Sequence, residues 1–258
     1  MNLLMLDLVD RFYALIWPLL RISAFMGFAS IFSIRAVNLR LRILISFGLT
    51  VFVAMQIDIP KIDPVTVVGV KEIFNQLFIG FSMAMVMQLA TAALVIAGQA
   101  LSGSMGLTMA NMIDPTLGNV PVLSQFFTLL GTLVFLAIGG HLIVFGILLE
   151  SFTQFPIGQS LMTQAFMGKM IAWSGMMFLA SLLIALPVLI TLLFVNVGLG
   201  FVTRAAPSLN IFAVGFPAMI FAGFLVLIVS MDAIGGRIDW LWMQAFGVLR
   251  DLTGVSRV

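Results

Sequence analysis

The sequence reads Leu101-Ser-Gly-Ser-Met-Gly-Leu-Thr-Met-Ala-Asn-Met-Ile-Asp-Pro-Thr-Leu-Gly-Asn119 in the middle of its longest nearly uncharged region. From Ile73 to Leu149, only Asp114 carries a charge, and it precedes Pro115. Because about 20 apolar residues already span a bilayer, this region must contain at least two membrane-embedded helices. The quoted stretch lies between them and is poor in helix-forming residues. Irregular backbone at membrane depth is tolerated only when it is buried in protein or lines a cavity, so we expect function at this junction.

The composition is that of a polytopic membrane protein. Of the 258 residues, 62% are hydrophobic and 9% are charged, whereas soluble domains usually carry about 25% charged residues. The net charge of +2 comes from few groups, and no cluster of Lys and Arg is large enough to bind nucleic acid. The sequence has no cysteine, which excludes disulfides, Cys-based metal sites and thiolate nucleophiles.

The apolar runs between charged residues predict an all-α fold with about six membrane helices. They lie roughly at Phe12–Ile34, Ile43–Ile57, Ile73–Gly98, Val122–Leu149, Met170–Val195 and Ile211–Met231. The second is short for a full span. The first contains Arg21 near its centre. Since a lone arginine at mid-bilayer costs roughly 2.5–3.5 kcal/mol, we expect Arg21 to face protein or water instead of lipid.

The sequence lacks a convergent set of catalytic residues, which an enzyme needs. The single histidine, His141, has no acidic residue near it, so we expect a packed or hydrogen-bonded helix residue and no zinc site. Asp114 has no acidic partner at membrane depth, and no Gly-x-Ser-x-Gly, P-loop or dinucleotide-binding motif occurs. We therefore predict no enzymatic activity, no metal and no cofactor.

A self-sufficient secondary transporter for a small solute is the alternative function. Such transporters bind their substrate at broken helices near the middle of the membrane, and they usually pair two breaks in related halves. The break at residues 101–119 fits this pattern. The nearest second break, from Asn196 to Pro207, has the character of a short turn. This alternative predicts function from the chain alone or from a homo-oligomer.

A series of motifs along nearly the whole chain resembles one known family. They are Pro18-Leu-Leu-Arg21 with Ala24, Met105-Gly-Leu-x-x-Ala110, Asp114-Pro115, Asn119-x-Pro-Val-Leu123, Gly140-His-Leu142 leading to Phe152 and Pro156, Leu186-Pro-Val188, Asn196-x-x-Leu-Gly200, Arg204-x-Ala-Pro207 and Leu209-Asn-Ile-Phe-x-Val-Gly-Phe-Pro217. In order and spacing, these motifs resemble the FliR/SctT/SpaR family of type III export-gate subunits. The flagellar FliR branch is more similar to the chain than the injectisome branch.

The resemblance implies a FliP-like helical portion at residues 1–169, a FliQ-like helical hairpin at 170–250 and a tail at 251–258. It implies a hetero-oligomeric gate with FliP and FliQ subunits, with FlhA and FlhB nearby. The gate would lie in the bacterial inner membrane at the flagellar basal body and project partly to the periplasmic side, where it passes unfolded rod, hook and filament subunits. The residues expected to act in assembly are Arg21, Asn196, Arg204, Pro207, Asn210 and Pro217.

The resemblance also implies that Met105–Asn119 is the family's pore-plugging loop. The residues expected to plug or gate the pore are Met105, Gly106, Leu107, Met109, Asn111, Met112, Asp114, Pro115, Gly118 and Asn119. The residue types agree, because glycine permits tight turns, Asp-Pro favours a turn or a helix start, and methionines can form a soft seal. Asp114 equally suits a simple helix cap, and both roles are compatible.

Overall fold

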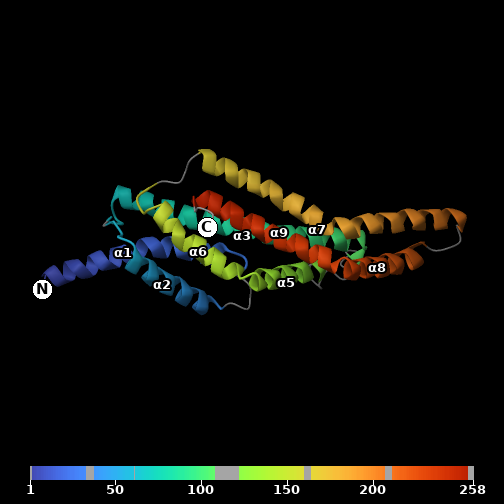
Figure 1. Cartoon of the computed structure of the whole chain (residues 1–258), viewed down its shortest axis with the longest axis horizontal. Helices are drawn as coiled ribbons and strands as arrows, with labels where there is room; N and C mark the ends of the chain where they lie inside the picture. Colours follow the sequence, from blue (N-terminus) through green and yellow to red (C-terminus); the bar gives the residue numbers. More distant parts are fainter. Residues whose placement is uncertain are drawn as a thin grey trace. The chain divides into compact units, whose positions relative to one another are not determined.

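The computed structural model describes residues 2–32, 38–60, 62–107, 122–159, 164–206 and 211–254. Within these ranges every regular element is a helix, which confirms the predicted all-α class (Figure 1). The predicted count of six membrane helices is not confirmed, because the described residues contain eight helices. They are α1 (Asn2–Phe28), α2 (Leu39–Gln56), α3 (Val67–Ser104), α5 (Val122–Ala137), α6 (Gly140–Gln154), α7 (Gln164–Ala205), α8 (Ile211–Val229) and α9 (Met231–Thr253).

Three helical segments are long and apolar enough to cross a membrane, namely Leu39–Gln56, Val67–Ser104 and Phe166–Ala205. The number rises to five if the bent pairs α5–α6 and α8–α9 each count as one span. The first predicted span, Phe12–Ile34, is wrong in its limits. The helix begins at Asn2 and ends at Phe28, and its apolar part, Leu15–Phe28, is shorter than a full span.

The predicted single helix Val122–Leu149 is also wrong, because the structure breaks it into α5 and α6. Gly139 lies at the break with a φ of 68° and a ψ of 23°, in the left-handed region. Glycine adopts this conformation without the steric cost that a Cβ atom brings. The Gly139 carbonyl then accepts a hydrogen bond from the Leu142 N–H at 2.9 Å, so a new helix begins directly after the break.

The helices form two compact units that alternate along the chain. Unit 1 consists of Met1–Leu89, Gly139–Ser174 and Gln244–Val258, and unit 2 consists of Ala90–Ile138 and Gly175–Met243. Each unit has its own buried aromatic residues: Trp17, Phe25 and Phe152 belong to unit 1, and Phe127, Phe135 and Trp242 belong to unit 2. The resemblance implies a boundary between residues 169 and 170, which separates a FliP-like portion from a FliQ-like hairpin. That boundary stays a prediction.

Small residues bring the helices of unit 2 close together. A Cβ atom on Gly98 of α3 would lie 2.5 Å from the backbone nitrogen of Ser124 in α5. The Ser124 hydroxyl donates a hydrogen bond to the Val95 carbonyl at 2.9 Å. On the same helix α5, the Gly131 carbonyl accepts a hydrogen bond from the indole N–H of Trp242 in α9 at 2.9 Å. Such close approach of backbones is how membrane helices gain packing and hydrogen bonding.

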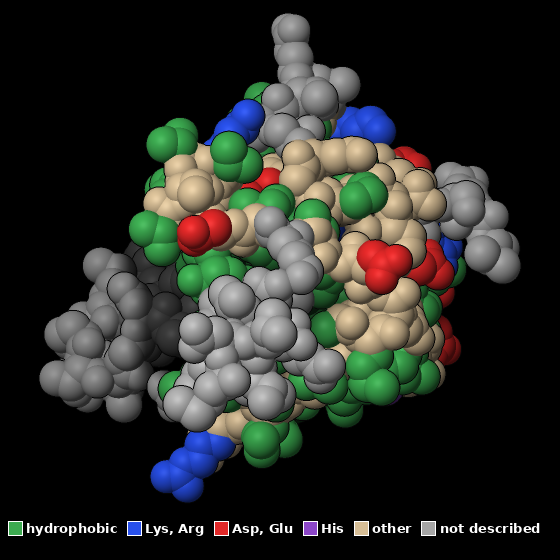
Figure 2. Space-filling model, turned by 90° about the vertical axis from the view of Figure 1, so that its left-hand side faces the viewer, with side chains coloured by type: hydrophobic (Ala, Val, Ile, Leu, Met, Phe, Trp, Pro, Cys, Tyr) green, Lys and Arg blue, Asp and Glu red, His purple; other side chains and the backbone are tan. Residues whose placement is uncertain are grey.

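Helix α2 buries its small face and exposes its large hydrophobic side chains. Ser46, Thr50 and Val53 are buried, whereas Leu44 and Phe47 are exposed. The two hydroxyls donate to backbone carbonyls one turn earlier, so their burial leaves no donor unpaired. Figure 2 shows hydrophobic side chains and several Asp and Glu side chains on one face, with the Lys and Arg side chains apart from one another near its rim. The described residues on this face therefore form no basic patch.

Candidate functional site

Arg21 of α1 is fully buried and lies within unit 1. Its Nε donates a hydrogen bond to Oε1 of Gln76 in α3 at 2.7 Å. Its Nη1 donates to the carbonyl and hydroxyl oxygens of Ser151 in α6 at 2.9 and 3.1 Å, and its Nη2 donates to the Phe155 carbonyl at 2.9 Å. The guanidinium carbon also lies 4.0 Å from the centre of the Phe152 ring. All three guanidinium nitrogens therefore have partners within the chain.

Glu72 supplies the opposite charge, and Gln76 connects it to Arg21. The Gln76 amide nitrogen donates to Oε1 of Glu72 at 2.5 Å, while its oxygen accepts from Arg21. The same Glu72 oxygen accepts a hydrogen bond from the Gly158 N–H at 2.9 Å. Glu72 and Gln76 stand four residues apart on α3, so they share one face of that helix.

A fourth side chain completes this network. Asn75 of α3 is buried and donates hydrogen bonds to Oε2 of Glu72 and to the Gln159 carbonyl. Arg21, Glu72 and Asn75 thus hold the backbone of residues 155–159, which follows α6 directly. We call the side chains of Arg21, Glu72, Asn75 and Gln76 the connector clamp.

The clamp confirms the prediction that Arg21 faces protein or water instead of lipid, because its partners are groups of the chain itself. The role of Arg21 in assembly stays a prediction, and satisfying its guanidinium requires no other subunit. Sequence reasoning missed Glu72, because it began the third helix at Ile73, and it did not single out Asn75 and Gln76 inside that helix. Their spacing at i, i+3 and i+4 beside an apolar run was the signal that could have placed them on one buried helix face.

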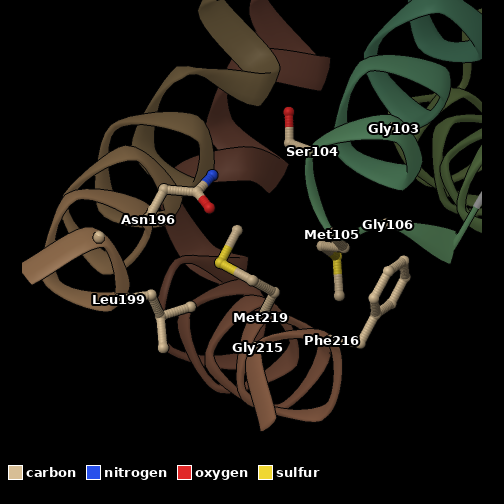
Figure 3. Close-up of a pocket in the computed structure, with 10 residues that line it drawn as sticks. Gly103, Ser104, Met105, Gly106, Asn196, Leu199, Gly215, Phe216 and Met219 are labelled. Atoms are coloured by element: carbon tan, nitrogen blue, oxygen red, sulfur yellow. The ribbon is translucent and has the colours of Figure 1, made fainter. Parts of the chain in front are cut away.

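A pocket of about 350 Å³ lies in unit 2 beside the end of α3 (Figure 3). Three helices contribute to its walls: the last turn of α3, the C-terminal part of α7 and the first turns of α8. The lining residues are Gly103, Ser104, Met105, Gly106, Asn196, Leu199, Gly200, Gly215, Phe216 and Met219. None of these side chains carries a formal charge, and the walls are mostly apolar or glycine.

The turn that ends α3 forms one wall of this pocket. The Met105 N–H donates to the Leu101 carbonyl at 2.9 Å, and Gly106 has a φ of 76°, which favours glycine. Met105 is fully buried. A Cβ atom on Gly223 of α8 would lie 2.6 to 2.8 Å from three Met105 side-chain atoms, so the methionine fills the space above that glycine. Gly106 packs similarly against the Phe216 ring.

The pocket brings together three of the predicted site residues, Met105, Gly106 and Asn196. Leu107 follows the turn and is half-buried, while Arg204 of α7 and Pro217 of α8 are exposed. The other predicted site residues lie outside the described residues. They are Met109, Asn111, Met112, Asp114, Pro115, Gly118, Asn119, Pro207 and Asn210. Sequence reasoning missed Leu199, Phe216 and Met219 as pocket residues, because nothing in their local pattern shows which helices meet.

His141 is half-buried in the first turn of α6. Its Nδ1 atom is buried and has no hydrogen-bond partner among the residues that the structure describes. Across those residues, no group of three or more His, Asp or Glu side chains lies close enough to hold a metal ion.

Comparison with known proteins gives the family. The chain matches the bacterial export proteins, family 1, over residues 12–245. It belongs to this family. It is 34% identical to the flagellar biosynthetic protein FliR of Pectobacterium carotovorum subsp. carotovorum over 95% of both chains. Identity to the FliR proteins of Escherichia coli strain K12 and Bacillus subtilis strain 168 is 33% and 30%, over 92% and 88% of this chain and 91% and 90% of theirs.

The FliR resemblance predicted from the motifs is therefore confirmed. The chain is a component of the flagellar protein export apparatus. Its long apolar helices make it a membrane-embedded component.

Proposed function

We propose that the chain is a structural and gating subunit of the flagellar type III protein export gate. It forms part of the closed entry pore through which unfolded rod, hook and filament subunits cross the inner membrane. Membership of an export-protein family over residues 12–245 supports this role, as do the three to five candidate membrane spans. The role is not enzymatic, because the chain supplies a path and a seal instead of a reacting group.

The gating role depends on one observation, the fixed turn at the end of α3. Met105 is buried against Gly223, and Gly106 turns the chain beside Phe216. The proposed plug, Met105–Asn119, therefore starts from a well-packed position. It contains further methionines, whose flexible side chains suit a soft seal around variable cargo. The proposed plug residues after the turn are Leu107, Met109, Asn111, Met112, Asp114, Pro115, Gly118 and Asn119.

The exposed hydrophobic surface of α7 and α8 supports a gate built with other subunits. Only 33% of an apolar 18-residue stretch within Phe166–Ala205 of α7 is buried. Leu193 of α7 and Phe221 of α8 are 62% and 71% exposed. We propose that this FliQ-like hairpin, at residues 170–250, packs on helices of FliP and FliQ subunits, with FlhA and FlhB nearby. The FliP-like portion is residues 1–169, and the assembly projects partly to the periplasmic side. The proposed assembly residues are Arg21, Asn196, Arg204, Pro207, Asn210 and Pro217.

The second candidate is a self-sufficient transporter for a small solute. The two bent helix pairs, α5–α6 and α8–α9, would suit it, because transporters often pair broken helices. Family membership favours export instead, since relatives from distant bacteria are all named FliR. Solute uptake by the purified chain alone in lipid vesicles would support the transporter.

The plug assignment predicts a leak when the loop is removed. Residues 108–119 are replaced by a Gly-Ser linker of equal length, which keeps Met105 and Gly106 in place. We expect normal assembly with the other gate subunits and a membrane that leaks ions or small molecules, measured as dye influx into cells. The matched control exchanges only Met109 and Met112 for Leu, which keeps an apolar seal. Normal export without leakage from the linker variant would show that these residues are not the plug.

A further inference from the structure

We infer that the contact between Met105 at the end of α3 and Gly223 of α8 is a latch, which is shut in this structure and releases during export. This inference rests on the proposed function, because it assigns a moving part to the proposed gate. Both residues belong to unit 2. We call the contact of Met105 with Gly223 the α3–α8 latch.

The latch consists of one side chain that is seated in a notch. Met105 is fully buried, and Gly223 is buried as well. A Cβ atom on Gly223 would lie 2.6, 2.7 and 2.8 Å from the Cε, Cγ and Sδ atoms of Met105. Figure 3 shows the Met105 side chain extending from the end of α3 toward α8, with the Phe216 ring beside it. The methionine therefore occupies the space that a side chain at position 223 would need.

Packing alone holds Met105 in this notch. Among the residues that the structure describes, no hydrogen bond joins the turn at 103–106 to α8. The thioether side chain of methionine is flexible and adapts to more than one set of neighbours. The connector clamp differs, because opening it would leave buried charges without partners. The latch can therefore release at a much lower cost in free energy than the clamp.

The chain on both sides of Met105 allows this movement. Gly103 has open space around it, and Gly106 has a φ of 76°, a conformation that costs glycine no steric strain. The pocket of about 350 Å³ adjoins the notch, and Met105 itself lines it. The side chain can thus leave the notch for existing space, without displacing a helix.

A neighbouring hydroxyl favours a second position of the last turn of α3. Ser102 is 1% exposed, and its Oγ atom makes no hydrogen bond with any residue that the structure describes. A buried hydroxyl without a partner costs free energy, and such groups are uncommon in native structures. A rotation of this turn as Met105 leaves the notch would give the hydroxyl a partner. The shut position therefore stores part of the free energy that release requires.

A reversible disulfide across the latch tests this inference in the assembled gate. The chain contains no cysteine, so Met105→Cys with Gly223→Cys introduces a single pair. The Met105 Cγ atom lies 2.7 Å from the Cβ position of residue 223. The Cβ atoms of the two cysteines therefore come within about 4.2 Å, in the range of about 3.5–4.5 Å that a disulfide spans. Host cells that carry this pair in the full complex are treated with an oxidant and then with a reductant, and exported flagellar protein is measured in the medium.

The matched control is the pair Leu94→Cys with Gly131→Cys. Leu94 is buried, and its Cδ1 atom occupies the space that a Cβ atom on Gly131 would need. This contact joins α3 to α5 within unit 2 and does not involve α8. The extent of disulfide formation in both pairs is measured by thiol labelling and mass spectrometry, together with the yield of the complex.

We expect the latch disulfide to lower export at least about tenfold and the reductant to restore it, because the disulfide removes the open position from the equilibrium. The control disulfide should keep export within about twofold of the untreated level, since it favours neither position of the latch.

Gly223→Ala should have the opposite effect. The added methyl group displaces Met105 from the notch, so dye influx into cells should rise about tenfold as the open position becomes more populated. The control is Gly198→Ala, which adds the same methyl group to α7 in open space and should leave dye influx unchanged.

The outcomes separate the latch from the proposed function. Normal export with the latch disulfide fully formed overturns the latch while the export function stands. Three other results overturn it as well: failure of the latch pair to form a disulfide where the control pair does, an equal block from the control pair, and no added leak from Gly223→Ala. If the host exports flagellar proteins normally without this chain, the proposed function itself fails.

Discussion

Arg21 is buried among hydrophobic side chains, yet each of its guanidinium nitrogens has a hydrogen-bond partner. The planar fork of arginine sends donors in several directions at once, toward Gln76, Ser151 and Phe155. Lysine has all its donors on one nitrogen and cannot reach three partners on different segments. The relay through Gln76 to Glu72 then places a negative charge near the guanidinium without direct contact. The residue type is thus dictated by the geometry of its partners.

Removing the Arg21 side chain should destabilise the chain strongly. Arg21→Leu leaves Glu72 buried without a compensating charge, which typically costs about 3–5 kcal/mol. We expect a low yield of the variant in the complex that is purified in mild detergent, and a lowered unfolding temperature of that complex. Arg40→Leu is the control, because Arg40 is exposed. The double variant Arg21→Leu with Glu72→Gln should recover part of the loss, since it removes the unpaired charge. A normal yield from Arg21→Leu alone would contradict the clamp.

Among the helices, the break between α5 and α6 shows how one backbone angle divides an apolar run. The sequence from Val122 to Leu149 is uncharged and predicts one span. The left-handed conformation of Gly139 ends that helix, and the next one begins at Gly140. The two adjacent glycines were the signal in the sequence, but glycines are also frequent inside membrane helices. The pattern alone therefore predicts a continuous helix.

Two glycine variants near this break should have opposite effects. Gly139→Ala places a Cβ atom in the left-handed region and should cost about 1–2 kcal/mol. Gly146→Ala lies inside α6 with open space around it, so it should stabilise the helix by up to about 1 kcal/mol. Thermal unfolding of the purified protein, followed by tryptophan fluorescence, measures both. An unchanged melting temperature in Gly139→Ala would mean that the purified protein does not keep the break at this residue.

Apolar runs predicted the central parts of most helices but not their ends. Charged residues were taken as boundaries, whereas α3 continues through Lys71 and Glu72 back to Val67. The apolar runs missed helix α9 because its charges interrupt the uncharged run, although the helical hairpin implied by the resemblance extends to residue 250. Its buried residues Ile234 and Ile238 nonetheless recur at helical spacing.

The site was predictable only where a motif marked it. Motifs singled out Met105, Gly106 and Asn196, and the structure places all three in one pocket. The connector clamp was not predictable in the same way. The hydrogen bonds that Arg21 makes join residues 55 to 134 positions apart in the sequence, and tertiary packing alone brings such residues together.

For the molecule as a whole, the described helices leave much hydrophobic surface uncovered. Helix α2 exposes Leu44 and Phe47, and α8 exposes Phe221 and Ile228. Lipid covers part of such a surface, but partner helices also need faces like these. The proposed gate therefore predicts that the chain is isolated with other proteins bound to it.

A pull-down from the native host in mild detergent, followed by native mass spectrometry, tests this assembly. We expect one copy of the chain in a large complex with several copies of two other small membrane proteins. An unrelated, equally hydrophobic inner-membrane protein with the same tag is the control. A monodisperse monomer or homo-oligomer that stays folded would contradict the gate and favour the solute transporter.

The hydrogen bonds of Arg21 also set an order of events during biosynthesis. Ser151 follows Arg21 by 130 residues, which a ribosome takes about 7 to 26 s to add at roughly 5–20 residues per second. Throughout this interval the first helix carries a guanidinium without its final partners, so a stable place in the bilayer is unfavourable for it. The helix that leaves the ribosome first can therefore complete the hydrogen bonds of Arg21 only after α6 and the residue that follows it have been made.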